Sequence, residues 1–273
     1  MKTFLFWISA VLILAFWPLS FILSNSDSWV PFILAASLVL LDYFLFRTGN
    51  KLRYFIYLLL PLIHPAYLLI PFLIFLLNIK NFDKTGLFIF SFLLFLVSLF
   101  SWKTFYAYSI FTPDPLAKDT LIKKISLIPN RNLARIFENK TTVFQNKYKA
   151  NLFVSLDPNN YFFALHPRES GDNQNLIKYS YLAIIPFLLG LFYLKDSRDK
   201  AWLVSVFLAM VLSISFINNQ DRFDILLCVP VSIMSIFGLK KLKTLSAKYF
   251  LIFSVVFVLI SFIELARIII YRS

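Results

Sequence analysis

The 273-residue chain contains one cysteine, Cys228, which lies inside an apolar run. A single cysteine excludes an intramolecular disulfide framework and a metal site built from several thiolates. Extended polar sequence is also scarce, because residues 109–177 are the only such region. Hydrophobic residues make up 59% of the chain and the mean hydropathy is +0.75, more apolar surface than a water-soluble domain can cover. The composition predicts an all-α, polytopic helical membrane protein.

Three further features are missing from the sequence. No soluble surface carries grouped basic side chains, so the net charge of +13 indicates membrane topology and attraction to anionic lipids, not nucleic-acid binding. No A-x-A-like cleavage site follows the first apolar run, MKTFLFWISAVLILAFWPLS, which we expect to be a retained helix. No internal repeat is detectable, which argues against a transporter built from two related halves.

Eight apolar spans follow one another along the chain. Most are long enough, at about 1.5 Å per residue, to cross a hydrocarbon core of roughly 30 Å. Cytoplasmic loops collect Lys and Arg, yet eight plain crossings place the Arg47–Arg53 cluster and the Lys80/Lys84 pair on opposite faces. The spans are residues 3–24, 29–46, 54–77, 85–108, 178–195, 201–217, 223–239 and 249–270.

A proline-broken hairpin at residues 54–77 removes this conflict. The segment contains three prolines and has His64 at its centre, and each proline removes a backbone donor and clashes with the preceding turn. If Tyr54–Ile63 enters the membrane and Ala66–Leu77 returns, every short basic cluster and the N-terminus lie on one face, the cytoplasm. The expected fold has about seven full transmembrane helices, this short hairpin and an extracytoplasmic helical loop.

The chain divides into three regions at the boundaries of the polar loop. Residues 1–108 hold the N-terminal membrane helices with the 54–77 hairpin, residues 109–177 form the extracytoplasmic loop, and residues 178–273 hold four C-terminal membrane helices. An amphipathic helix is expected over Asp114–Ile128, where Leu121, Ile125 and Ile128 share an apolar face. Pro129 ends it.

The second half of the loop also shows helical patterns. Short helices are expected over Asn130–Glu138 and Thr142–Leu156, the latter with Phe144, Tyr148 and Leu152 on one face. A turn is expected at residues 157–160, after which the aromatic run 161–163 returns toward apolar surroundings. These patterns predict a cap that packs on the outer face of the bundle.

Several stretches of the sequence resemble one enzyme family. They include SIFTPDPLAKDTLIKKI, NRNLARIFENKTTVFQNKYKANLFVSLDPNNYFF, YSYLAIIPFLLGLFYL and INNQDRFDILLCVP, with FWPLSFILSNSDSW and LIHPAYLLIPFLIF before them. In this order they resemble bacterial integral-membrane glycosyltransferases of the GT-C architecture, of the protein O-mannosyltransferase and aminoarabinose-transferase type. The resemblance implies a hexosyl- or pentosyltransferase that takes a sugar from a polyprenyl-phosphate donor on the extracytoplasmic face.

One part of the family pattern is absent. Members of this family open with a helix and a long outward loop whose acidic residues deprotonate the acceptor or hold a metal. This chain starts at what would be about the third or fourth helix of the family. Transfer requires a base for the acceptor hydroxyl and a cation for the leaving phosphate. The sequence offers a candidate for the cation only, so a partner subunit would supply the acidic loop and any divalent metal. No cofactor is evident in the chain itself.

The candidate cation is Arg222, which we expect to bind a lipid phosphate together with His64 and Tyr67. Arg222 is the only basic residue in the short outer loops between two transmembrane helices, its guanidinium can grip a phosphate at two points, and the family has an arginine in the matching place. The alternatives are an arginine that snorkels to headgroups or pairs with Asp221. His64 has a structural alternative too, because its imidazole can satisfy a carbonyl freed by Pro65.

The remaining candidates have simple structural alternatives. Asp27 is the one candidate for assisting the acceptor, but it also suits the N-cap of a helix that begins at Ser28. Asp157, His166 and Arg168 would line a polar entrance to a cavity, or else form a solvated loop face. They lack the spacing of metal ligands.

Three functions remain open from the sequence. The first is a GT-C-type transferase that handles a polyprenyl-phosphate sugar with a membrane partner subunit. The second is a non-catalytic lipid-binding or scaffold subunit with the same bundle, and the third is a small transporter. In each case we expect a multi-pass protein of the cytoplasmic membrane whose N-terminus is cytoplasmic. We expect it to interact with the lipid bilayer and not with nucleic acid.

Overall fold

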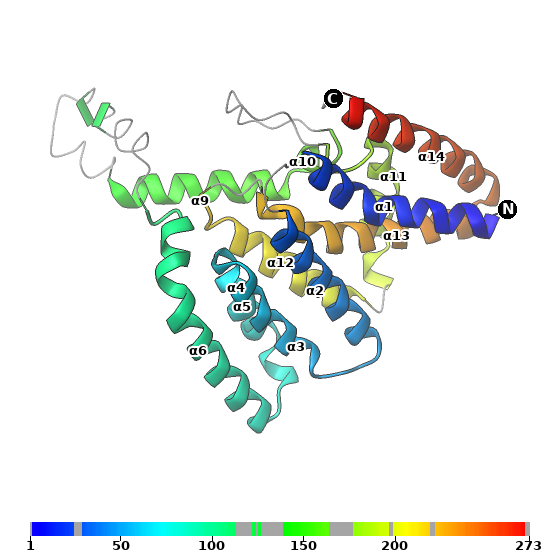
Figure 1. Cartoon of the computed structure of the whole chain (residues 1–273). Coiled ribbons are helices and arrows are strands. Elements are labelled where there is room, and N and C mark those ends of the chain that lie inside the picture. The colour runs from blue at the N-terminus through cyan, green and yellow to red at the C-terminus, as the bar shows by residue number, and fades with distance from the viewer. Residues whose placement is uncertain are drawn as a thin grey trace.

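The computed structural model describes residues 2–24, 29–112, 122–123, 125–126, 139–163, 177–196, 199–218 and 222–270. Within these residues the regular structure is helical, with no strand beyond one isolated bridge between Ser109 and Ile217. The all-α class predicted from the sequence is confirmed (Figure 1).

Five helices of the described chain are long and apolar enough to cross a membrane. Four of them match predicted spans to within two residues at each end. The fifth begins with the short helix η7 (Asp224–Leu227) and continues past the predicted end of its span at residue 239, through Lys240, Lys241 and Lys243. The five are α1 (Lys2–Ser24), α2 (Val30–Arg47), α6 (Lys84–Tyr108), η7 with α13 (Cys228–Leu245), and α14 (Ala247–Ile270).

The predicted count of seven full spans is not confirmed, because two spans contain shorter helices. Residues 178–195 hold η4 (Tyr181–Ala183) and α11 (Ile184–Phe192), and residues 201–217 hold α12 (Lys200–Ile214). Apolar composition alone does not show where a helix ends. After α12 the chain turns away, and the backbone N–H of Ile110 donates to the carbonyl of Phe216 at 2.8 Å.

The segment between α2 and α6 is broken at His64 and folds back on itself. The first arm contains α3 (Arg53–Ile56), η1 (Tyr57–Leu59) and α4 (Leu60–Ile63), and the second contains η2 (Pro65–Leu68), α5 (Leu69–Asn78) and η3 (Ile79–Asn81). His64 itself has an extended backbone with φ −149° and ψ 122°. The two ends meet, because Asn81 Nδ2 donates to the hydroxyl of Tyr54 at 3.0 Å. This is the hairpin geometry expected from the prolines.

The turns that carry basic residues gather at one end of the bundle, which we call the basic end. Arg47, the last residue of α2, forms an ion pair with Asp199 just before α12, with 3.0 Å between Nη1 and Oδ1. The Nζ of Lys241 lies 5.1 Å from the ring centroid of Tyr193. These contacts join the end of α2 to the start of α12, and α13 to Tyr193, which follows α11.

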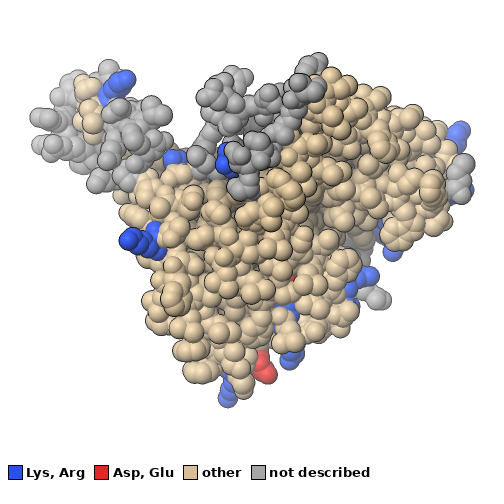
Figure 2. Space-filling model, viewed as in Figure 1, with Lys and Arg blue, Asp and Glu red and all other residues tan. Residues whose placement is uncertain are grey.

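The N-terminus reaches the same end, where the Nζ of Lys243 lies 5.2 Å from the ring centroid of Phe6. Figure 2 shows that the visible surface is mostly uncharged, with Lys and Arg side chains at its margins. At the opposite end lie α9 (Lys140–Leu156) and α10 (Asn159–Phe162), and we call it the loop end. In Figure 1, α9 lies across the end of α6 there.

The described part of the 109–177 loop agrees with the expected cap. Asn139 is the N-cap of α9, and its side chain accepts from the Thr142 N–H at 2.9 Å. Its predicted apolar face packs inward, since the rings of Phe144 and Tyr148 lie 6.1 and 4.7 Å from that of Phe216. Tyr161 is buried as well. The helices expected over 114–128 and 130–138 lie almost wholly outside the described residues.

Candidate functional site

Three consecutive residues at the loop end enter three different environments. Arg222 is exposed, Phe223 is 5% exposed within a cluster of aromatic rings, and Asp224 is 2% exposed within a polar network. These residues form the short connection into α13 through η7. The position of the exposed arginine is therefore set by what its two neighbours contact.

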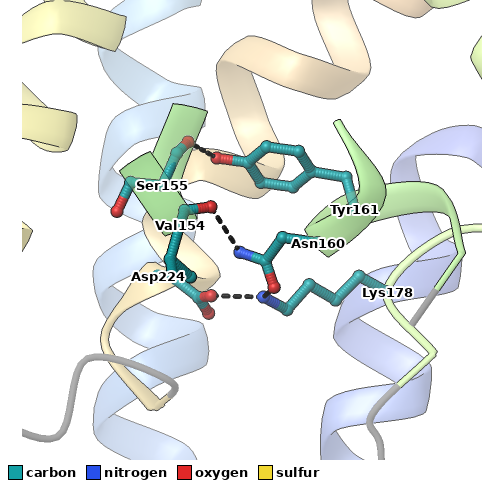
Figure 3. Close-up of polar contacts among 6 residues, drawn as sticks. All are labelled: Val154, Ser155, Asn160, Tyr161, Lys178 and Asp224. Atoms are coloured by element: carbon teal, nitrogen blue, oxygen red, sulfur yellow. Dashed lines mark hydrogen bonds and ion pairs between the residues drawn. The ribbon is translucent and has the colours of Figure 1, made fainter. Parts of the chain in front are cut away.

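Asp224 forms a buried ion pair with Lys178, as Figure 3 shows. Their side chains are 3% and 1% exposed. The Nζ of Lys178 also donates to Oδ1 of Asn160 at 2.8 Å, and Asn160 Nδ2 donates to the carbonyl of Val154 at 3.2 Å. Burial of charge is unfavourable unless the charges are paired and hydrogen-bonded, and this arrangement meets that condition.

Two aromatic side chains complete the surroundings of Lys178. Its Nζ lies 5.2 Å from the ring centroid of Trp17 on α1 and 5.7 Å from that of Tyr161 on α10. At these distances the ring faces attract the ammonium group. The hydroxyl of Tyr161 donates to the carbonyl of Ser155 (Figure 3). Burial, with smaller effects of Asp224 and Asp157, raises the pKa of Tyr161 well above its ordinary value, so this phenol stays neutral.

Phe223 lies in an aromatic cluster at the tip of the hairpin. Its ring centroid is 4.9 Å from that of His64, 5.8 Å from that of Tyr67 and 5.5 Å from that of Phe32. Tyr108, from the last turn of α6, lies 4.9 Å from His64. The cluster therefore joins the hairpin tip to α2, α6 and the connection that carries Arg222.

His64 makes a local hydrogen bond that determines how its ring can act. Its Nδ1 accepts from the backbone N–H of Ala66 at 3.2 Å. In a neutral imidazole one ring nitrogen accepts and the other carries the hydrogen, so Nε2 is left as a donor. The side chain is half-buried. His64 is thus both the cap of η2 and a hydrogen-bond donor at the loop end.

Phe223, the chain neighbour of Arg222, contacts the other two predicted phosphate-binding residues, His64 and Tyr67, and the three predicted residues differ in exposure. Arg222 is exposed, His64 is half-buried and Tyr67 is fully buried. The Tyr67 hydroxyl has no hydrogen-bond partner within the described part of the chain. Arg222 and part of His64 are therefore exposed at the surface, whereas Tyr67 is a buried member of the aromatic cluster.

The other predicted residues do not join this site. Asp157 is half-buried and forms a local turn, because its Oδ1 accepts from the N–H of Asn159 at 2.9 Å. Asp27, His166 and Arg168 lie outside the described residues. Among the residues that are described, no group of three or more His, Cys, Asp and Glu side chains is arranged to hold a metal ion.

Sequence reasoning missed the buried ion pair of Lys178 and Asp224. Each lies at the start of an apolar span, where a charged residue is ordinarily assigned to the membrane interface. A usable signal was present in Lys178, which directly precedes the aromatic run YSY. The partner of each charge lies 46 positions away, and no local pattern indicates that pairing.

No protein family, no curated protein and no solved structure matches this chain.

Proposed function

We propose that this chain is a GT-C-like protein of the cytoplasmic membrane that binds a polyprenyl-phosphate-linked sugar on its extracytoplasmic face. The observation that carries the proposal is the position of Arg222. It is an exposed cation at the loop end, next to Phe223, which contacts His64 and Tyr67. A lipid phosphate requires a permanent cation and benefits from further donors, and Arg222 and His64 supply both.

The distribution of positive charge supports the proposed orientation. The basic turns and the N-terminus meet at the basic end, and Lys and Arg collect on the cytoplasmic side of membrane proteins. In the proposed orientation the N-terminus would lie in the cytoplasm and Arg222 at the outer interface, where the phosphate of an outward-facing lipid would lie. Among the short connections at that end, Arg222 is the one basic residue of the sequence.

Transfer of the sugar requires a base for the acceptor, and we propose that a partner subunit supplies it. The described carboxylate closest in sequence to Arg222 is Asp224, which is buried and paired with Lys178. A carboxylate held in this way is a poor base for an incoming hydroxyl. A divalent metal would likewise require the acidic loop of the partner. With such a partner the chain would act as a hexosyl- or pentosyltransferase.

The second candidate function is a non-catalytic lipid-binding or scaffold subunit. The pairing of Asp224 with Lys178 also favours this function. Because the paired carboxylate is a poor base, the site offers phosphate binding and not catalysis. The two functions differ in whether a partner is present and active. Purification in mild detergent, followed by mass spectrometry and a sugar-transfer assay of the purified complex, distinguishes them.

Native mass spectrometry with added polyprenyl phosphate tests the lipid site directly. Loss of a charge-assisted hydrogen bond costs about 1.5–3 kcal/mol, so Arg222→Ala should weaken lipid binding roughly tenfold or more. Arg222→Lys should restore binding only in part, because lysine lacks the planar two-point geometry. Lys103→Ala is the matched control, since it removes another exposed cation from the last turns of α6. Equal lipid occupancy in all variants would contradict the proposal.

A further inference from the structure

We infer that the Lys178–Asp224 ion pair positions Arg222 at the lipid phosphate, an inference that rests on the proposed function. Asp224 follows Arg222 by two residues and is the first residue of η7. Its carboxylate is held by Lys178, so the connection from residue 222 to α13 is fixed at one point within the protein. Neither charge touches the ligand, and both are positioning residues.

The pair connects more elements than stability of one helix end requires. Lys178 lies three residues before η4, pairs with Asp224 of η7, donates to Asn160 of α10 and has its Nζ near the ring of Trp17 of α1. The segment that carries it is held in turn, because the hydroxyl of Ser20 donates to the carbonyl of Ile177. Movement of any of these elements would displace the connection that holds Arg222.

The energetics of buried charge favour a role in geometry over one in stability. Well-packed apolar residues of similar volume often replace a buried ion pair with no loss of stability. An ion pair differs from such packing in that it has a defined direction and a defined partner, which fixes one arrangement among several of similar energy. A two-point grip on a phosphate depends on that kind of fixed geometry.

The alternative is that the pair serves the fold alone. The double variant Lys178→Met/Asp224→Leu separates these roles, because it removes both charges together and leaves neither one buried without a partner. If the pair only stabilises the bundle, a double variant that keeps its thermal stability will also keep its lipid affinity. If the pair positions Arg222, the affinity will fall while the thermal stability is kept.

The lipid experiment uses the full chain in detergent, with polyprenyl phosphate titrated in native mass spectrometry and thermal stability measured in parallel. We expect the double variant to bind the lipid on the order of tenfold more weakly, close to Arg222→Ala. The control is Arg47→Met/Asp199→Asn, which removes a cation–carboxylate pair at the basic end and should leave binding unchanged. Wild-type affinity in a stable double variant would overturn the inference.

A second measurement needs no lipid and therefore separates this inference from the proposed function. Spin labels are placed at residues 103 and 222 in a Cys228→Ala background, and the distribution of distances between them is measured by electron paramagnetic resonance. We expect a narrow distribution with the ion pair intact and a broader or shifted one in the double variant.

An unchanged distribution overturns the positioning role, even where Arg222 binds lipid. A broadened one supports it, even where Arg222→Ala leaves lipid occupancy unchanged and the proposed function fails. If the double variant does not fold, Lys178→Gln/Asp224→Asn, which removes both charges but keeps polar side chains of similar size, is measured in its place.

Discussion

Tyr54 and Asn81 are hydrogen-bonded to each other across the two ends of the hairpin, at 3.0 Å from Nδ2 to the phenolic oxygen. The ring of Tyr54 also lies 4.7 Å from that of Phe82. The chain therefore leaves the basic end and returns to it within 27 residues. If the bundle spans a membrane in the proposed orientation, both flanks of this hairpin face the cytoplasm.

Cysteine labelling tests this topology at Asn50 and Lys80, which flank the hairpin and are both exposed. In a Cys228→Ala background, an impermeant maleimide added to intact cells should label neither position, and both should react after the membrane is opened. The cysteine is placed at residue 80 and not at the neighbouring residue 81, because replacing Asn81 would remove its hydrogen bond to Tyr54. Reaction of only one position from outside would show that the segment crosses the membrane.

The packing of α11 against α13 depends on two glycines. A Cβ added at Gly238 would lie 1.7 Å from the carbonyl oxygen of Pro186, and one added at Gly190 would lie 2.0 Å from that of Met234. Both obstacles are backbone atoms, so relief requires the helices to separate. Small residues permit this close approach between membrane helices.

Gly190→Ala and Gly238→Ala should each destabilise the protein, by about 1–3 kcal/mol or more, because overpacking forces backbone shifts. Thermal unfolding in detergent, followed by size-exclusion chromatography, measures the effect. Gly86→Ala is the control, since the nearest atom to its added Cβ is the Asp83 side-chain oxygen at 2.5 Å, which can move. Equal effects at positions 86 and 238 would contradict the interpretation of a close helix crossing.

Asp42 of α2 accepts two buried hydrogen bonds, from the Tyr57 hydroxyl and from Nε1 of Trp202. It is 1% exposed, and it joins α2 to the hairpin and to α12. Asp42→Leu should destabilise the bundle by about 1–3 kcal/mol for each donor that it leaves unsatisfied. Asp42→Asn keeps an acceptor oxygen and should be milder. Thermal stability in detergent compares the two, and a leucine variant as stable as the asparagine variant would show that the hydrogen bonds contribute little.

The sequence predicted those parts of the fold that depend on local patterns. Pro61, Pro65 and Pro71 indicated the break near His64, and the 3.6-residue period indicated the inward face of α9. These signals lie within one or two helical turns of the residues they affect. The lengths of α11 and α12 were not accessible in this way, because the turn after α12 is fixed by Ile110, which is distant in sequence.

The candidate site was accessible only in part, for the same physical reason. Arg222 stood out as a cation in a short connection between apolar spans, and His64 as an ionisable group between prolines. The contact of His64 with Phe223, the neighbour of Arg222, requires the tertiary fold. The Lys178–Asp224 pair also depends on that fold, since each charge resembles an ordinary interfacial residue until its partner is known.

His64 offers a test that separates its structural role from its proposed binding role. Its Nδ1 caps η2 through the Ala66 N–H, and asparagine is also a good acceptor at such a position. His64→Asn should therefore retain most of the stability that His64→Ala loses, roughly 1 kcal/mol for a lost cap. Asparagine does not place a donor where Nε2 lies, so lipid affinity should fall in both variants if that nitrogen binds the phosphate. Thermal unfolding and native mass spectrometry with polyprenyl phosphate are measured on the same samples. Wild-type lipid affinity in a stable asparagine variant would restrict His64 to its capping role and leave Arg222 as the phosphate contact.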